Sequence, residues 1–116
     1  MADYDLWSEI QSKTKQLDYS VKELRKSGTA YAEAEKAYKI KLRETALRLR
    51  SQDMAVGMIS MTVYGVQEVA ELRFKRDCCE AVYKANVEAI NAIKLEIRII
   101  NEQVSREWGQ AGTGSM

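Results

Sequence analysis

Proline and histidine are both absent from this sequence of 116 residues, and each absence excludes something. Without proline, nothing in the interior forbids long helices, and the abundant Ala, Leu, Glu, Lys, Arg and Gln favour them. Without histidine, Ser-His-Asp triads, imidazole zinc sites and the ExxH motif of di-iron bundles cannot be built. The sequence also lacks a P-loop, a GxGxxG motif and a nucleophile elbow. It therefore predicts a helical protein that is not an enzyme, with no cofactor and no metal site.

An excess of charge of one sign is also lacking, because 18 basic residues nearly cancel 17 acidic ones. Such a balance disfavours a protein that binds DNA or an anionic membrane over its whole surface. No apolar run approaches the ~20 residues that span a bilayer. The N-terminal MADYDLW is acidic where a secretory signal is basic. We therefore expect a cytoplasmic protein with no membrane partner.

Cysteine is scarce, and the two that occur, Cys78 and Cys79, are adjacent. Adjacent side chains on a helix point about 100° apart, which disfavours a mutual disulfide, so we expect reduced packing residues. The last eight residues, GQAGTGSM, show no apolar periodicity. We expect residues 109–116 to form a flexible tail outside the fold, with GTGSM derived from an expression vector.

Apolar residues recur with a seven-residue period in the first half, which predicts a helix over about residues 3–51. The recurring positions form a seam for a partner helix. They are Trp7, Thr14, Val21, Gly28, Glu35, Leu42 and Leu49 in one set, and Ile10, Leu17, Leu24, Tyr31, Tyr38 and Thr45 in the other. Gly28 is the weak point, since glycine costs about 1 kcal/mol relative to alanine inside a helix. It predicts either a kink or a close helix crossing.

The same period continues in the second half and predicts a helix over about residues 63–108. Its seam positions are Val69, Arg76, Tyr83, Ile90, Ile97 and Val104, together with Leu72, Cys79, Asn86, Ile93 and Ile100. Further apolar residues widen the face beyond this seam: Phe74, Cys78, Ala81, Val82, Ala85, Ala89, Ala92, Leu95 and Ile99. One partner helix cannot cover a face that wide, so more helices are needed.

The two helices predict one domain, residues 1–108, in the form of a long antiparallel helical hairpin. At 1.5 Å per residue it would be roughly 65 to 70 Å long. Such a hairpin buries too little apolar surface to offset the conformational entropy of ordering about 100 residues. The expected fold class is therefore all-α, with hairpins assembled into a coiled-coil-like oligomeric bundle. The alanines at 81, 85, 89 and 92 would admit a second hairpin closely. A four-helix dimer is the simplest arrangement, and higher symmetric assemblies remain open.

The bend between the helices, about residues 52–62, is either a loop or a short third helix. If it is helical, Ser51 or Asp53 would be its N-cap. Met54, Met58 and Met61 would then face inward as adaptable filler. Closing the end of the bundle is the favoured role of this segment, and contact with a ligand is the alternative.

Basic residues gather before the bend: Lys39, Lys41, Arg43, Arg48 and Arg50. A hairpin midpoint near Met58 would bring Arg43 close to Arg73, and Arg76 close to Ile40. Nearby glutamates and aspartates can neutralise much of this charge in i, i+3 and i, i+4 pairs. A solvated, salt-bridged face is therefore the favoured interpretation, and an anion site is the alternative.

Two polar residues of the second helix, Arg76 and Asn86, point into the seam. A buried charge must be paired or must bind an anion. In the structural interpretation Asn86 fixes the helix register and Arg76 pairs with Glu35. In the functional one, a pocket between subunits uses arginines to hold a phosphate and tyrosines to stack on a base. The candidate ligand-binding residues are Arg43, Arg48, Arg73, Arg76, Tyr38, Tyr64, Tyr83 and Asn86.

The stretches YAEAEKAYKIKLRETALRLR and EVAELRFKRDCCEAVYKANVEAINAIKLEIRIINEQVSREW carry a resemblance to a known family. They resemble small helical proteins encoded by phages and prophages of Firmicutes. The similarity covers most of residues 6–108, with the YAEAE segment and the REW ending among its marks. It implies a phage origin, an accessory role in the host bacterial cytosol and no catalytic motif.

Three functional hypotheses follow. In the first, a homo-oligomer sequesters an anionic nucleotide-type immune signal, such as a cyclic dinucleotide or an ADP-ribose derivative, as a counter-defence sponge. In the second, a coiled-coil partner in phage recombination or replication contacts nucleic acid through the basic residues before the bend. The near-zero net charge disfavours that role. The third is a scaffold without a small ligand. The sponge is the prediction that we adopt.

Overall fold

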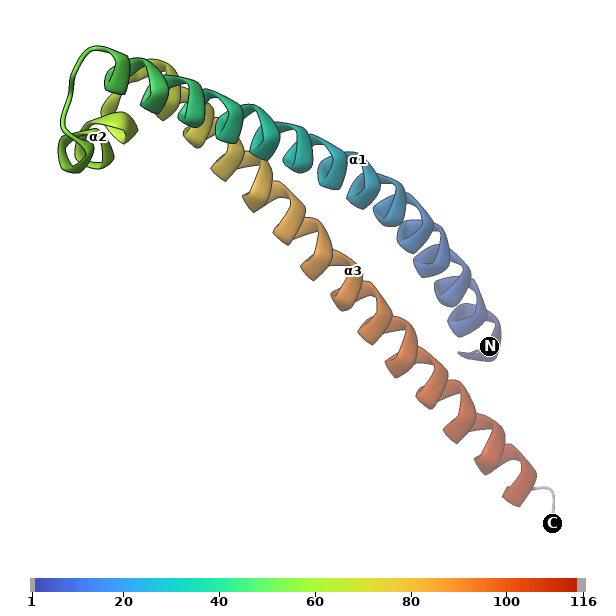
Figure 1. Cartoon of the computed structure of the whole chain (residues 1–116). Coiled ribbons are helices and arrows are strands. Elements are labelled where there is room, and N and C mark those ends of the chain that lie inside the picture. Colours follow the sequence, from blue (N-terminus) through green and yellow to red (C-terminus); the bar gives the residue numbers. More distant parts are fainter. Residues whose placement is uncertain (1, 115–116) are drawn as a thin grey trace. The chain divides into compact units, whose positions relative to one another are not determined.

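The chain is all-helical in its described residues, 2–114, whose side chains are described for residues 5–109. A computed structural model shows four elements in the order α1 (Ala2–Ser51), α2 (Val56–Thr62), the 3-10 turn η1 (Val63–Gly65) and α3 (Gln67–Gly114) (Figure 1). The described residues contain no strand, which confirms the all-α prediction and its two long helices. The oligomeric bundle stays a prediction.

The helices divide into two compact units. The first unit comprises Met1–Leu24 and Ala85–Met116, and the second comprises residues 25–84. In each unit a segment of α1 packs against a segment of α3. In the second unit the two segments are joined through α2 and η1 (Figure 1). The polar network described below belongs to the second unit.

Helix α1 ends in a Schellman motif built on Asp53. The Asp53 N–H donates to the Arg50 carbonyl over 3.0 Å, and the Met54 N–H donates to the Leu49 carbonyl over 3.2 Å. These two bonds satisfy carbonyls that a helix end leaves without partners. Asp53 has a φ of 64°, a left-handed conformation that aspartate tolerates better than most residues. The expectation that Ser51 or Asp53 caps a following helix is therefore wrong, because Asp53 terminates α1.

The bend contains the short helix α2, whose methionines do not face inward, whereas Met54 before it is half-buried. Helix α2 follows Ala55, has no side-chain cap and contains no buried residue. Met58 and Met61 are 52% and 77% exposed, so their predicted inward orientation is wrong. Val63 of η1, which is 4% exposed, takes the inner position instead. Helix α3 accordingly starts at Gln67, after η1, and not at about residue 63.

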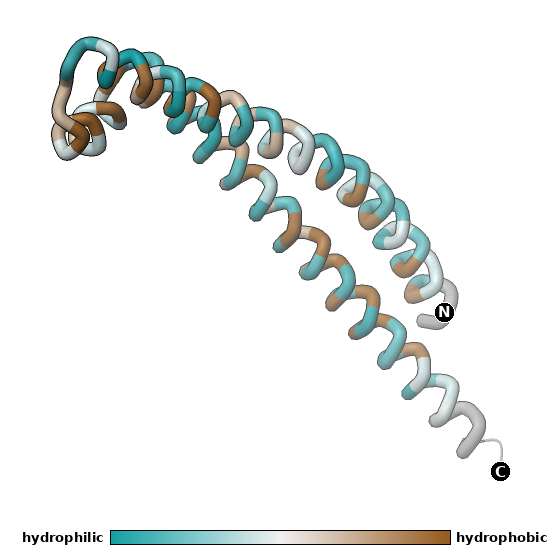
Figure 2. The backbone as a smooth tube through the Cα atoms, viewed as in Figure 1, coloured by the Kyte–Doolittle hydropathy of each residue, from teal (hydrophilic) through white to brown (hydrophobic). Residues whose placement is uncertain are grey.

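The seam predicted for the second helix is confirmed. Every predicted seam position of α3 is buried or half-buried: Val69, Leu72, Arg76, Cys79, Tyr83, Asn86, Ile90, Ile93, Ile97, Ile100 and Val104. Figure 2 shows hydrophobic positions recurring between hydrophilic ones along this helix. A seven-residue repeat therefore describes α3 over most of its length.

The seam of α1 departs from the prediction toward the N-terminus. Trp7 is 60% exposed and Thr14 is exposed, whereas Leu6 is 7% exposed. All the remaining predicted seam positions of α1, from Ile10 to Leu49, are buried or half-buried. The seven-residue seam is therefore confirmed along most of α1 and wrong at Trp7 and Thr14.

Helix α1 runs unbroken through Gly28, and the glycine permits a close approach. A Cβ at this position would lie 3.4 Å from Cε1 of Tyr83 on α3. Of the two roles expected for Gly28, the structure therefore shows the close helix crossing.

The C-terminal end of α3 extends past the predicted boundary. The helix continues to Gly114, whereas the periodicity predicts an end at about residue 108 and a flexible tail after it. The remaining tail residues, 115–116, lie outside the described residues. In the described part of the chain, no helix is both long enough and apolar enough to cross a membrane.

Candidate functional site

Arg76 lies at the centre of a polar network between α1 and α3 in the second unit. Its Nε is 2.9 Å from Asp77 Oδ1, and its Nη1 is 3.4 Å from Glu35 Oε2. Its Cζ lies 4.7 Å from the ring centroid of Tyr38, and its side chain is only 20% exposed. Burial alone would lower the pKa of Arg76, but Asp77 and Glu35 together raise it. The structural interpretation of Arg76, pairing with Glu35, is therefore observed, and the charge of the guanidinium is already paired.

Tyr31 and Glu80 form a second polar contact between the same helices, which the sequence reasoning missed. The Tyr31 hydroxyl donates to Glu80 Oε2 over 2.6 Å, and Lys84 Nζ donates to Glu80 Oε1 over 3.2 Å. The Tyr31 hydrogen bond, followed by Lys84, holds the pKa of Glu80 below its ordinary value of 4.5. The same bond raises the pKa of Tyr31, because it favours the protonated phenol.

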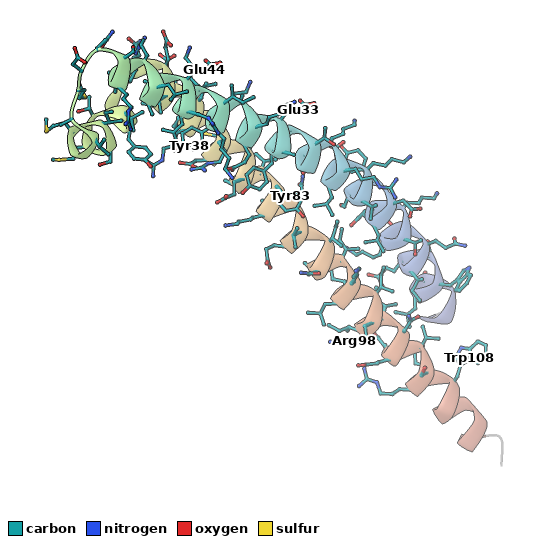
Figure 3. All side chains as sticks on the ribbon, viewed as in Figure 1. Glu33, Tyr38, Glu44, Tyr83, Arg98 and Trp108 are labelled. Atoms are coloured by element: carbon teal, nitrogen blue, oxygen red, sulfur yellow. The ribbon has the colours of Figure 1, made fainter. Side chains whose placement is uncertain are left out.

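A cavity of about 460 Å³, broadly open to the surface, lies beside Tyr31 and Tyr83. It is lined by Gly28, Tyr31, Ala32, Glu35 and Tyr83. The Tyr31 and Tyr83 rings are 5.9 Å apart between centroids and inclined by 38°. In Figure 3 Tyr83 lies between α1 and α3. Of the eight predicted ligand residues, only Tyr83 lines this cavity.

The ion pairs of the second unit fix the register of α1 against α3. Lys41 Nζ lies 2.8 Å from Glu68 Oε2, and this pair, like that of Glu35 and Arg76, is centred close to residue 55. The predicted midpoint near Met58 is therefore wrong by about three residues. Arg43 is consequently level with the start of α3 and not with Arg73.

Arg73 instead stacks on Tyr64 of η1. The Arg73 Cζ lies 5.5 Å from the ring centroid of Tyr64, and both side chains are exposed. Among the described residues Arg73 forms no ion pair. This pair combines an uncompensated guanidinium with an accessible aromatic ring.

The basic residues before the bend fall into two groups. Lys39 pairs with Glu35 over 3.4 Å, and Lys41 pairs with Glu68, whose pKa is lowered by the hydrogen bond and charge of Lys41. The three remaining arginines are exposed and form no ion pair within residues 5–109: Arg43, Arg48 and Arg50. The salt-bridged face is thus observed for the lysines and not for the arginines.

Asn86, the last predicted site residue, belongs to the first unit. Its Nδ2 donates to the Glu23 backbone carbonyl over 3.4 Å, which ties α3 to α1 at one level. Lys13 and Glu96 form an ion pair in the same unit. These contacts agree with the predicted role of Asn86 in fixing register.

Comparison of the chain with protein-family models, with curated proteins and with solved structures finds no match. The described side chains include no group of three or more His, Cys, Asp or Glu that could hold a metal ion. Any proposal about function therefore depends on the geometry given above.

Proposed function

We propose that this protein is a non-enzymatic helical binding protein that works as a homo-oligomer. The observation that supports this best is an uncovered apolar face on α3. In the second unit the face comprises Phe74, Cys78, Ala81 and Val82, and in the first unit Ala85, Ala89, Ala92, Leu95 and Ile99. All are exposed, and Phe74, Val82, Leu95 and Ile99 are 71%, 55%, 46% and 50% exposed.

Exposed apolar side chains that recur along one side of α3 are typical of a helix that packs against a partner. A second copy fits best as the cover, because it carries the same face and an isologous contact needs no other partner.

Mass measurement in solution tests the oligomer. Size-exclusion chromatography with light scattering at micromolar concentration should give a dimer or a higher assembly of 13.2 kDa chains. Leu95→Asp and Ile99→Asp should lower the mass, because each places a charge in the interface. Asn101→Asp is the matched control, since Asn101 is exposed on the side of α3 opposite Ala92. A wild-type chain that is well folded and monomeric would contradict the proposal.

The ligand in this proposal is an anionic nucleotide-type immune signal, which the oligomer sequesters in the host cytosol. Support comes from Arg73 and Tyr64, because a guanidinium stacked on an exposed ring can hold a phosphate while the ring stacks on a base. Arg43 and Arg48 add exposed positive charge. Arg76 contributes less than predicted, since two carboxylates already pair with it. The phage origin rests on the family resemblance.

Thermal unfolding with a panel of cyclic dinucleotides and ADP-ribose derivatives tests the ligand. A ligand at 100 times its Kd should stabilise the protein by about 2.7 kcal/mol. Arg73→Ala and Tyr64→Ala should remove this effect, whereas Arg98→Ala, at an exposed position of the first unit, should not. Recovery of intact ligand after heat denaturation would agree with sequestration without turnover. If no nucleotide stabilises the protein, the sponge hypothesis fails and the oligomer is unaffected.

The three unpaired arginines Arg43, Arg48 and Arg50 favour a second candidate, a coiled-coil partner that contacts nucleic acid in phage recombination or replication. The pairing of Lys39 and Lys41 with carboxylates weakens it. Retarded migration of single-stranded DNA that disappears steeply with added salt would support this role. If neither ligand class binds, the scaffold hypothesis is the one that survives.

A further inference from the structure

The cavity beside Tyr31 and Tyr83 has the features of a small-molecule site that differs from the proposed nucleotide site. Its volume of about 460 Å³ lies within the range of ligand pockets. It is formed entirely in the second unit, by residues of α1 and by Tyr83 of α3. We propose that this cavity binds a small organic cation, such as a quaternary or protonated amine.

Two aromatic rings form its walls, and both are held in place. The Tyr83 ring approaches the α1 backbone at Gly28, where a Cβ would be 3.4 Å from Cε1. The Tyr31 hydroxyl is anchored on Glu80 over 2.6 Å, so its ring cannot turn freely. The rings are 5.9 Å apart and inclined by 38°, which leaves their faces at an angle to each other. Ring faces carry partial negative charge and attract cations.

The charges around the cavity favour the same ligand. Glu35 is the charged residue on the lining, and no lysine or arginine lines it. Arg76 lies 3.4 Å from Glu35 but only 2.9 Å from Asp77, so its charge is divided between two carboxylates. The remaining cations lie at the surface. Lys39, which pairs with Glu35, is 70% exposed, and Lys84, which pairs with Glu80, is 72% exposed.

The ionisation of Tyr31 agrees with a negative local potential. The pKa of this tyrosine is raised by its hydrogen bond to Glu80, by burial and by the charges of Glu80 and Glu35, against the opposing charge of Arg76. A cation in the cavity would lie beside two aromatic rings and the Glu35 carboxylate. Arg76 and Lys39 pair with Glu35 from outside the lining, so an anion in the cavity would meet the carboxylate before either cation, and this cavity is distinct from the Arg73 and Tyr64 pair.

Choline and its neutral isostere 3,3-dimethylbutan-1-ol provide the test, because they share shape and differ in charge. Carbon-13-labelled tyrosine resonances are followed by NMR at constant ionic strength. Choline should give saturable shifts of Tyr31 and Tyr83, with Tyr19 and Tyr64 unaffected. The isostere should bind at least about fivefold more weakly, since it lacks the attraction of charge to ring and carboxylate.

Variants separate the ring from the carboxylate. Tyr83→Leu removes a ring face and should abolish saturable binding, whereas Tyr83→Phe keeps the face and should bind as the wild type does. Glu35→Gln should weaken choline binding by about threefold or more, as expected for loss of a partly exposed charge. Glu33→Gln is the matched control, because Glu33 is exposed and does not line the cavity.

Three results would overturn the proposal. They are equal affinity for choline and its isostere, unchanged choline binding by Tyr83→Leu that retains its helical circular dichroism, and the absence of any saturable shift. Displacement of choline by adenosine monophosphate would assign the cavity to nucleotides instead. None of these results bears on the oligomer or on the Arg73 site, which are tested separately.

Discussion

Replacing Asp53 with glycine should stabilise the protein, because this residue holds the end of α1 in a left-handed conformation. Its φ of 64° costs an ordinary L-residue about 1–2 kcal/mol. Aspartate bears less of this cost than most residues, since its short polar side chain tolerates the conformation. Glycine bears none, and it is the residue that Schellman motifs use most often at this position.

Two further effects determine the net magnitude. Glycine has more freedom in the unfolded chain, which offsets the gain by roughly 0.5–1 kcal/mol. Asp53 also places a negative charge beside the C-terminal end of α1, where the helix dipole is itself negative, at a cost of about 0.3–1 kcal/mol. Removing the strain and the charge together should therefore leave a net stabilisation of about 0.5–1 kcal/mol.

The measurement is urea unfolding followed by circular dichroism at one fixed protomer concentration, because the proposed assembly would make apparent stability depend on concentration. Asp53→Asn separates the two causes, since asparagine keeps the left-handed tolerance and loses the charge. Asp53→Gly should exceed Asp53→Asn, and Asp53→Ala should gain less than either. Ser51→Gly is the opposite control, because it weakens the last turn of α1 by about 1 kcal/mol. If Asp53→Gly is no more stable than Asp53→Ala, the Schellman assignment is refuted.

Three further predictions concern the second unit. Gly28→Ala should raise the free energy of unfolding in urea by up to about 1 kcal/mol, since alanine favours helix and its Cβ would meet Tyr83 at ordinary contact distance. A destabilised variant would show that the Tyr83 ring cannot tolerate the added methyl group. Arg76→Leu should destabilise by about 1 kcal/mol by leaving Glu35 half-buried without Arg76, and it should leave nucleotide-induced stabilisation unchanged if Arg76 is structural. The pKa of Glu80 is lowered in the folded state. Its contribution to the free energy of unfolding is therefore present above about pH 4.5 and is lost as the pH falls through the folded-state pKa. Glu80→Gln should therefore reduce the loss of unfolding free energy between about pH 4.5 and lower pH. If that loss is unchanged, the acid sensitivity belongs to other carboxylates.

The local periodicity of the sequence was sufficient to predict the two long helices and the seam of α3. Both depend on which residues recur along one helix, and no long-range information is needed for that. The pairing of Arg76 with Glu35 could also be predicted, because the seam of the facing helix contains a single acidic residue. The exposed apolar residues of α3 followed from the same pattern.

The bend and the α1 seam were harder to predict, for two different physical reasons. Asp53 reads as an N-cap because aspartate favours that position, yet the same short side chain also tolerates the left-handed end of a helix. At the N-terminal end of the α1 seam, Trp7 fits the seven-residue period while its neighbour Leu6 is the buried residue. The tryptophan is the more prominent hydrophobic residue, so the pattern favours the wrong neighbour.

The pairing of residues across the two helices required the register, which local patterns do not contain. A midpoint at residue 58 brings Arg43 beside Arg73, whereas the observed centre near residue 55 brings Tyr31 to Glu80 and Gly28 to Tyr83. Moving the midpoint by three residues changes the residue of α3 that faces a given residue of α1 by six, or about 1.7 helical turns, and so exchanges a cluster of arginines for a cavity with aromatic walls. Opposite charges that face each other in one register only, such as Lys41 with Glu68, are the signal that could have selected it.

The polar contacts between α1 and α3 and the apolar face of α3 determine different properties of the protein. Directional contacts such as those of Arg76 and Tyr31 are satisfied in one register, so they determine how α1 pairs with α3 in the second unit. The outer positions Phe74, Val82 and Leu95 are exposed and offer no directional bond. Arg76→Leu should therefore lower stability with little effect on the mass of the proposed assembly, whereas Leu95→Asp should lower that mass and, through it, the concentration-dependent stability. An Arg76→Leu variant whose mass also fell would show that the pairing of α1 with α3 depends on a second chain.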